Sequence, residues 1–125
     1  MSLANVVAPV GIAQDAVAVA LERSQATLGA YVAELQARRD LIAAELTGLP
    51  FGMPAGGWSL LLRVSDFALD GEQMAGRLLG QGVCATPMSG WGETHSRPDI
   101  RFVFANETLG RLRGLGARVR VAIGA

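Results

Sequence analysis

The stretch Arg97-Pro98-Asp99-Ile100-Arg101-Phe102-Val103-Phe104-Ala105-Asn106-Glu107 decides the fold of this chain. Its side chains alternate with the period of two that is typical of a β-strand, so Ile100, Phe102 and Phe104 fall on one face. Three large apolar side chains on one face indicate that this face packs against a hydrophobic core. The opposite face carries Arg101, which places a guanidinium in the middle of the strand.

Two interpretations of Arg101 follow from this alternation. A strand that buries one face usually exposes the other, so the first interpretation is a solvated arginine paired with Asp99 or with water. The second is an arginine that faces a cleft, where its planar fork binds a carboxylate through two parallel hydrogen bonds. The strand pattern alone favours neither of them.

The composition is that of one small apolar domain, and residues 1–125 are predicted to form a single domain. Half of the residues are hydrophobic and the mean hydropathy is +0.33. This value indicates either an unusually large core or an apolar surface that packs against a partner. The net charge is zero and no block of like charge occurs. We therefore expect no nucleic-acid partner.

The residue types exclude several kinds of chemistry. All eleven basic residues are arginine, and without lysine the chain cannot form a Schiff base. Cys84 is the only cysteine and His95 the only histidine, so we expect neither a disulfide nor a metal site. We expect His95 to face solvent, because no residue that would orient it as a general base is identifiable.

The N-terminal residues predict no targeting segment. Met1-Ser2-Leu3 carries no positive charge, and Pro9, Gly11 and Asp15 interrupt the apolar residues that follow. We therefore predict no signal peptide, no membrane span and a cytoplasmic location. The Met-Ser-Leu opening is consistent with a cloning remnant, with the domain itself at residues 4–125.

Two helices are predicted before the first strand. Residues 12–22 are rich in alanine and apolar on nearly every side, which suggests burial against a missing neighbour. Ser24 can cap a second helix over residues 26–46, where apolar residues recur at helical spacing. Gly48 and Pro50 end this second helix, and its charged face, which includes Arg38, Arg39 and Asp40, is predicted to be solvated.

The remaining elements alternate between strands and helices. A strand is predicted over residues 56–64, with Trp58, Leu60, Leu62 and Val64 on one face. Asp70 caps a helix over residues 71–80 whose inner face is Met74, Leu78 and Leu79. Residues 83–86 form a short strand in which Cys84 is expected to be a core residue. Glu107 opens one last helix with Leu109, Leu112, Leu115, Val119 and Ile123 at three-to-four spacing.

The predicted order α-α-β-α-β-β-α indicates an α+β domain. Its small three-stranded sheet would be mixed or antiparallel and covered by helices on one face. The other face would carry Ser59, Arg63 and Arg101, which could meet on one open surface.

Five segments, in order, resemble motifs of one enzyme family. They are Gln-Asp-Ala-Val-Ala-Val-Ala-Leu at 14–21, Arg-Arg-Asp-Leu-Ile at 38–42, Pro-Ala-Gly-Gly-Trp-Ser at 54–59, the segment 83–92 with Pro87, Ser89 and Gly92, and Asp-Ile-Arg-Phe-Val-Phe-Ala at 99–105. Together they resemble the class I/II aminotransferases, which are fold-type I enzymes that use pyridoxal phosphate. The resemblance covers residues 12–122 and implies the C-terminal, smaller domain of such an enzyme.

The resemblance implies a role for four residues. Arg101 stands at the position of the arginine that binds the α-carboxylate of the substrate, an amino acid or a 2-oxo acid. Trp58 follows the Gly-Gly pair at the substrate entrance, and Trp91 shapes the same side of the pocket. Ser89 belongs to the loop that carries Trp91. Met88 departs from the family, which usually has glycine at this position.

The family's cofactor-binding residues all lie upstream of the segments matched here. The resemblance therefore implies no catalytic residue, no cofactor-binding residue and no metal ligand in this chain. Pyridoxal phosphate would bind the intact enzyme, and the isolated chain would be inactive. Its partners would be the missing large domain, which the apolar helix at residues 12–21 would contact, and other copies in a homo-oligomer.

Two alternatives of a different class stay open. The chain could be a stand-alone α+β regulatory module that binds an amino acid without catalysis. It could also be a dimerisation module that associates through its apolar N-terminal helix. Hydrophobic composition alone agrees with all three hypotheses.

Overall fold

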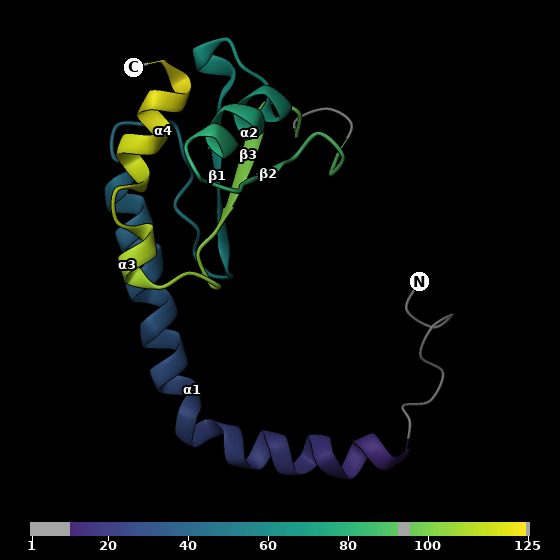
Figure 1. The fold of residues 1–125 in the computed structure, drawn as a ribbon. Helices are drawn as coiled ribbons and strands as arrows, with labels where there is room; N and C mark the ends of the chain where they lie inside the picture. The colour runs from purple at the N-terminus through teal and green to yellow at the C-terminus, as the bar shows by residue number, and fades with distance from the viewer. Residues whose placement is uncertain (1–10, 93–95, 125) are drawn as a thin grey trace. The chain divides into compact units, whose positions relative to one another are not determined.

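A computed structural model describes residues 11–92 and 96–124 (Figure 1). The chain divides into two units, Met1–Ala33 and Glu34–Ala125, and helix α1 (Gly11–Glu45) runs through both. In the first unit, every residue of 11–33 whose burial is described is exposed. The core lies in the second unit. The prediction of a single domain is not tested by this division.

Helix α1 replaces the two helices predicted for residues 12–46, and that prediction is wrong. Ser24 does not cap a new helix. Its hydroxyl donates to the carbonyl of Leu21 at 3.5 Å, one turn earlier, and the hydroxyl of Thr27 donates to the carbonyl of Ser24 at 3.1 Å. A serine that bonds back into the preceding turn leaves the backbone free to continue as helix.

Three short strands form the antiparallel sheet, and the predicted α+β class is confirmed. They are β1 (Ser59–Arg63), β2 (Thr86–Pro87) and β3 (Asp99–Val103), in the order β1-β3-β2. In the register, Leu61 lies opposite Arg101 and Leu62 opposite Ile100. The strand at residues 99–103 is therefore the central one. Between β1 and the next helix lies the short 3-10 helix η2 (Ser65–Phe67).

The hydrophobic core lies on the predicted face of β3. Ile100, Phe102 and Phe104 are at most 4% exposed, and on β1 the alternate residues Leu60 and Leu62 are buried with them. Other buried members are Ile42, Leu46, Val64, Leu69, Met74, Leu78, Val83, Leu112, Leu115, Val119 and Ala122. The predicted alternation is therefore confirmed except at Trp58, which was predicted on the same face as Leu60 and Leu62 but is 51% exposed.

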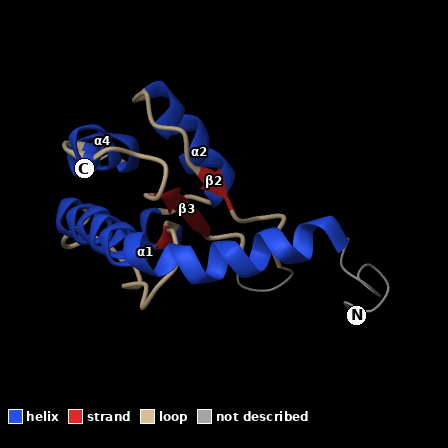
Figure 2. Cartoon of the chain, turned by 90° about the horizontal axis from the view of Figure 1, so that it is seen from below, coloured by secondary structure: helices blue, strands red, loops and turns tan. Residues whose placement is uncertain are grey.

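Helix α2 (Gly71–Gly80) lies against β2 and β3, as Figures 1 and 2 show. Its N-terminus is a capping box: the Asp70 carboxylate accepts from the backbone N–H of Gln73, and the Gln73 side chain accepts from the N–H of Asp70. Met74 and Leu78 face the core as predicted. Leu79 is 68% exposed, so its assignment to the inner face is wrong, because it lies one position, about 100°, around the helix from Leu78.

The single helix predicted from Glu107 is two helices, α3 (Leu109–Leu112) and α4 (Leu115–Ile123). Thr108, not Glu107, caps α3 by accepting from the N–H of Arg111. Between the two helices Gly114 has a φ of +76°, a left-handed conformation that interrupts helical hydrogen bonding. The apolar spacing of three to four residues continues past Gly114 without change. The sequence pattern alone therefore did not indicate that the helix is interrupted there.

Helix α4 begins against the end of α1. The Glu45 carboxylate accepts from the backbone N–H groups of Gly114 and Gly116, both at 3.0 Å. These hydrogen bonds, above all the one from Gly114, lower the pKa of Glu45, and nearby Arg118 and Arg120 act in the same direction. A Cβ at Gly116 would lie 2.0 Å from the carbonyl oxygen of Glu45. Only glycine allows the two helix ends this close approach.

The segment before β2 also differs from the prediction. The strand begins at Thr86 instead of residue 83, and Cys84 is exposed instead of buried. Val83 takes the core position, and its neighbour Cys84 faces away. None of the described helices is long and apolar enough to cross a membrane.

Candidate functional site

Three of the four predicted site residues form one cluster on the sheet face opposite the core. The guanidinium carbon of Arg101 lies 5.0 Å from the ring centroid of Trp58 and 4.4 Å from that of Trp91. Both distances are within the range of a cation–π interaction. Both indoles are largely exposed, at 51% for Trp58 and 63% for Trp91. We call Trp58, Arg101 and Trp91 the arginine–tryptophan cluster.

Backbone hydrogen bonds hold both tryptophans near β3. The carbonyl of Trp58 accepts from the N–H of Phe104 at 3.1 Å and from the N–H of Ala105 at 3.3 Å, which fixes the start of β1 against the end of β3. On the other side, the N–H of Trp91 closes a turn on the carbonyl of Met88 at 2.9 Å. Met88 is itself bonded to β3, because its N–H donates to the carbonyl of Asp99 at 3.1 Å.

The charge of Arg101 has no counter-ion among the residues that the structure describes. Its Nε is buried without a hydrogen-bond partner, and no carboxylate of the described part of the chain lies within ion-pair distance of it. Asp99, the acid suggested by its place in the strand, pairs with Arg63 instead, at 3.5 Å. The interpretation of Arg101 as an arginine paired with Asp99 therefore does not hold. A part-buried guanidinium without a carboxylate is a strong anion site.

Ser89 lies in the loop of Trp91, but its contact is with another element. Its hydroxyl donates to the carboxylate of Glu72 on α2 at 2.6 Å. No hydrogen bond joins Ser89 to Arg101 in the described structure, and the hydroxyl of Ser89 instead ties its loop to α2. His95 lies outside the described residues.

The predicted meeting of Ser59, Arg63 and Arg101 on one face agrees with the strand register. Ser59 lies opposite Val103 and Arg63 opposite Asp99, on the same side as Arg101. Beside them lies a hollow of about 410 Å³, lined by Arg63, Asp99, Leu61 and residues 50–52. The open face of the sheet is therefore polar at its centre and hollowed along β1.

Arg38 is a residue whose role the sequence analysis missed. It was predicted to be solvated, but its side chain is only 16% exposed. Its guanidinium donates to the carbonyl of Ala105 and pairs with Glu34 one turn earlier on α1. The spacing of four residues between Glu34 and Arg38 was a visible signal for the ion pair. Nothing local in the sequence indicated the bond to Ala105.

The residues present do not fit a pyridoxal-phosphate site. The sequence contains no lysine to hold the cofactor as a Schiff base. The unpaired cation of the cluster is flanked by two indoles, which offer no hydrogen-bond acceptor to a pyridinium nitrogen. The cluster suits a carboxylate, and any cofactor would have to be bound by residues outside this chain.

The fold was compared with known proteins. Comparison with protein-family models gives no match, and comparison with curated protein sequences gives none either. Among solved structures, an aromatic aminotransferase from Pyrococcus horikoshii OT3 matches 98% of this chain with a TM-score of 0.81 and 26% identity. An aspartate aminotransferase from Thermus thermophilus, solved with maleate, matches 98% with a TM-score of 0.70 and 28% identity.

A further similar structure is N-succinyldiaminopimelate aminotransferase from Mycobacterium tuberculosis, which is 30% identical over 87% of this chain, with a TM-score of 0.67. The chain spans only about a third of the length of each of these proteins, from 30% to 34%. The resemblance found in the five sequence motifs is thereby confirmed. The extent of the match is that of one domain of an aminotransferase.

Proposed function

We propose that this chain is the C-terminal, substrate-carboxylate-binding domain of a pyridoxal-phosphate-dependent aminotransferase. The observation that carries the proposal is Arg101, a cation without a counter-ion among residues 11–92 and 96–124, held between two exposed tryptophans at the centre of the open sheet face. Its ligand would be the α-carboxylate of an amino acid or of the corresponding 2-oxo acid. The coarser conclusion, a fragment of an aminotransferase, is supported by the fold comparison.

The geometry of the cluster favours a carboxylate. The Nε of Arg101 is buried, whereas its two terminal nitrogens are not among the buried unpartnered atoms. Those two nitrogens form the edge of the fork that binds a carboxylate with two parallel hydrogen bonds. The indoles of Trp58 and Trp91 restrict the plane of the guanidinium and reduce the water around it, which strengthens the ion pair.

Arg101 would contribute binding and orientation, and no proton transfer. Amino-group transfer needs pyridoxal phosphate and its lysine, which the rest of the enzyme would supply. We therefore expect the isolated chain to bind no cofactor and to be inactive. Holding the substrate in one orientation would still account for a substantial part of the rate of the intact enzyme.

The exposed apolar side chains of residues 11–33 support a surface on which the missing large domain would pack. Val17 and Leu21 are 54% and 64% exposed, and Tyr31 is also 64% exposed. Apolar side chains of this size are rarely left in water along one element. In the cytoplasmic enzyme that we propose, the large domain would cover them, and the intact protein would form a homo-oligomer. In the isolated chain, a second copy would take this place.

Tryptophan fluorescence tests the role of Arg101, because Trp58 and Trp91 are the only two tryptophans. We expect maleate, the dicarboxylate present in the Thermus structure, to change the emission of the 125-residue chain in a saturable way. The neutral diamide maleamide should not. Arg101→Gln should abolish the response, since a neutral amide cannot replace the charged fork.

The matched control is Arg63→Gln, which removes the same charge from the same sheet face, in β1, where the arginine already has Asp99 as its partner. This variant should keep the maleate response. Equal loss in both variants would reduce the effect to general electrostatics and contradict a specific carboxylate site. An unchanged response in Arg101→Gln would contradict the proposal outright.

A further inference from the structure

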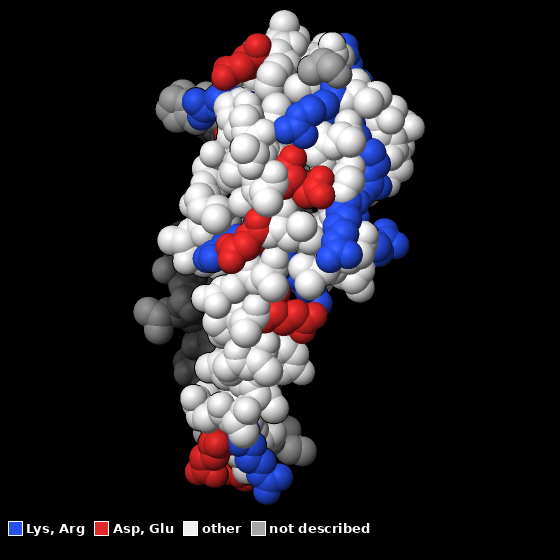
Figure 3. All heavy atoms as spheres, turned by 90° about the vertical axis from the view of Figure 1, so that its left-hand side faces the viewer, with Lys and Arg blue, Asp and Glu red and all other residues white. Residues whose placement is uncertain are grey.

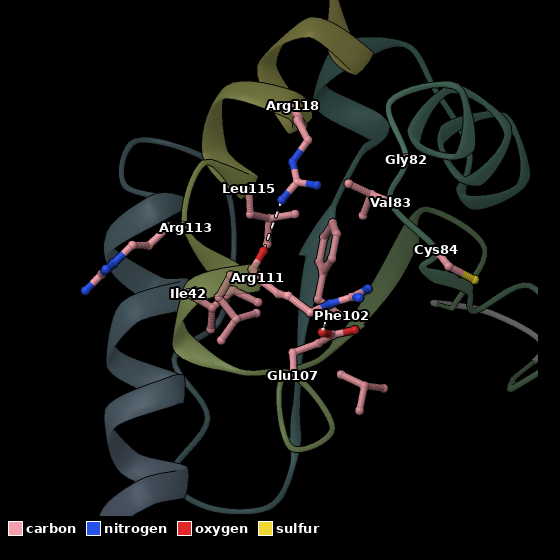
Figure 4. Close-up of a pocket in the computed structure, with 13 residues that line it drawn as sticks. Ile42, Gly82, Val83, Cys84, Phe102, Glu107, Arg111, Arg113, Leu115 and Arg118 are labelled. Carbon is pink, nitrogen blue, oxygen red and sulfur yellow. Dashed lines mark hydrogen bonds and ion pairs between the residues drawn. The ribbon is translucent and has the colours of Figure 1, made fainter.

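A second cavity lies in the unit formed by residues 34–125, away from the arginine–tryptophan cluster. Its volume is about 480 Å³, within the range of small-molecule sites. Its wall is mixed: polar atoms contribute the larger part, and the apolar side chains of Val83, Phe102 and Leu115, each less than a tenth exposed, contribute the rest. Figure 4 shows Phe102 at its centre, between the strand and the two C-terminal helices. Phe102 follows Arg101 in β3 and faces the opposite side of the sheet.

The interruption between α3 and α4 contributes much of this cavity. Its lining includes Gly110, Arg111, Leu112 and Arg113 before the left-handed Gly114, and Leu115 and Arg118 after it. A single continuous helix, as the leucine spacing predicted, would not turn around the cavity in this way. The cavity is therefore a property of this sequence and its glycine at position 114.

The cavity has an excess of positive charge. Two arginines, Arg111 and Arg118, direct their side chains toward the cavity, and a third lining arginine, Arg113, points away from it, against one acid, Glu107 (Figure 4). Arg111 pairs with Glu107 at 2.6 Å. Arg118 is half-buried and donates to the carbonyls of Gly114 and Arg111, at 3.4 and 3.1 Å, without a carboxylate partner in the described structure. Figure 3 shows the face that carries α3 and α4, where arginine side chains gather in a column.

We propose that this cavity binds a small organic acid with an apolar body, such as an aryl or branched-chain carboxylate. Its carboxylate would lie against Arg118, with Arg111 beside it, because the hydrogen bonds of the Arg118 guanidinium in the described structure go to neutral carbonyls. Arg118 also acts at longer range on the Glu45 carboxylate, but the two form no ion pair among the described residues. The apolar body would replace water against Phe102, Val83 and Leu115. The site is independent of the proposed function, because neither Arg101 nor either tryptophan lines it.

Two-dimensional ¹H–¹⁵N NMR of the 125-residue chain tests the proposal with phenylacetate as the probe. We expect saturable shifts centred on the amides of Gly82, Val83 and Gly110, which line the cavity. Phenylacetamide, which has the same ring without the charge, should bind at least tenfold more weakly. Acetate, which has the charge without the ring, should also bind at least tenfold more weakly. Equal binding of either analogue, or no saturable shift at these amides, would overturn the proposal.

Two arginine variants test which arginine binds the carboxylate of phenylacetate. Arg118→Gln should weaken phenylacetate binding about tenfold, the effect of one charge-assisted hydrogen bond. Arg113→Gln is the matched control, because the Arg113 side chain points away from the other labelled side chains in Figure 4. Equal weakening by both variants would overturn a local site. Arg101→Gln should leave these shifts intact, so failure of the carboxylate site at Arg101 would not imply failure here.

Discussion

The two units of the chain place similar residues in opposite environments. In residues 11–33, Val17, Leu21 and Tyr31 are between 54% and 64% exposed. In the unit formed by residues 34–125, Leu62 and Phe104 are at most 1% exposed. The difference shows that apolar composition does not by itself make a core. A single helix has no second layer against which to bury its side chains.

The exposed helix nevertheless has good local reasons to form. Alanine is frequent in residues 12–22, and alanine has the highest helix propensity of all residues. Propensity stabilises a helix weakly compared with tertiary packing. The stability of the chain should therefore come almost entirely from the sheet unit, and the predictions below test this comparison.

The largest effect is expected from Phe104→Ala. This change removes a fully buried ring from the core and should reduce the free energy of unfolding by about 3–5 kcal/mol. Leu21→Ala is the control in the exposed helix and should change it by less than about 0.5 kcal/mol. Urea unfolding followed by circular dichroism measures both. A large loss of unfolding free energy in Leu21→Ala would mean that residues 11–33 are packed, and would contradict the inferred difference between the two units.

The next effect concerns the contact between α1 and α4. Gly116→Ala would place a methyl group 2.0 Å from the Glu45 carbonyl oxygen, and because this neighbour is backbone it should cost about 3 kcal/mol. Gly110→Ala is the control, because the nearest atom to its Cβ would lie 3.9 Å away. It should be neutral or slightly stabilising. Thermal unfolding of the two variants distinguishes steric overlap from a general loss of glycine.

A smaller effect is expected from the pH dependence of the same contact. The pKa of Glu45 is lower in the folded state than in the unfolded chain, because the N–H groups of Gly114 and Gly116 bind its ionised form. Its contribution is complete above the ordinary carboxyl pKa and is lost as the pH falls through the lowered folded-state pKa.

Glu45→Gln, which loses the charge but keeps an acceptor, should cost about 1 kcal/mol at neutral pH and little in strong acid. Urea unfolding at several pH values measures the difference between the two proteins. A constant difference across the acid range would show that the carboxylate charge does not stabilise the start of α4.

Local signals predicted most of the sheet unit. Asp70 indicated the start of α2, and the alternation of Ile100, Phe102 and Phe104 indicated the buried face of β3. These signals depend on residues only a few positions apart. The predictions failed where an element depends on a contact with residues far away in the sequence or on an unusual backbone conformation. The left-handed Gly114, for example, interrupts a helix whose leucine pattern is otherwise regular.

The candidate site could be predicted in part for the same reason. Arg101 stood out as a charged residue within a strand, and the family resemblance singled out Trp58 and Trp91. That the two indoles flank one guanidinium depends on the pairing of β1 with β3 and on the bond from Met88 to Asp99. The cavity beside α3 had no sequence signal, because it results from a break in a helix.

The contact between Glu45 and the start of α4 also constrains the order in which the protein can be completed during synthesis. Helix α1 is made before α4, yet its end is held by Gly114, Gly116 and Arg120, which follow Glu45 by 69 to 75 residues. Leu115, Val119 and Ala122 add the final part of the core. A nascent chain on the ribosome therefore has to be extended through α4 before this core can close.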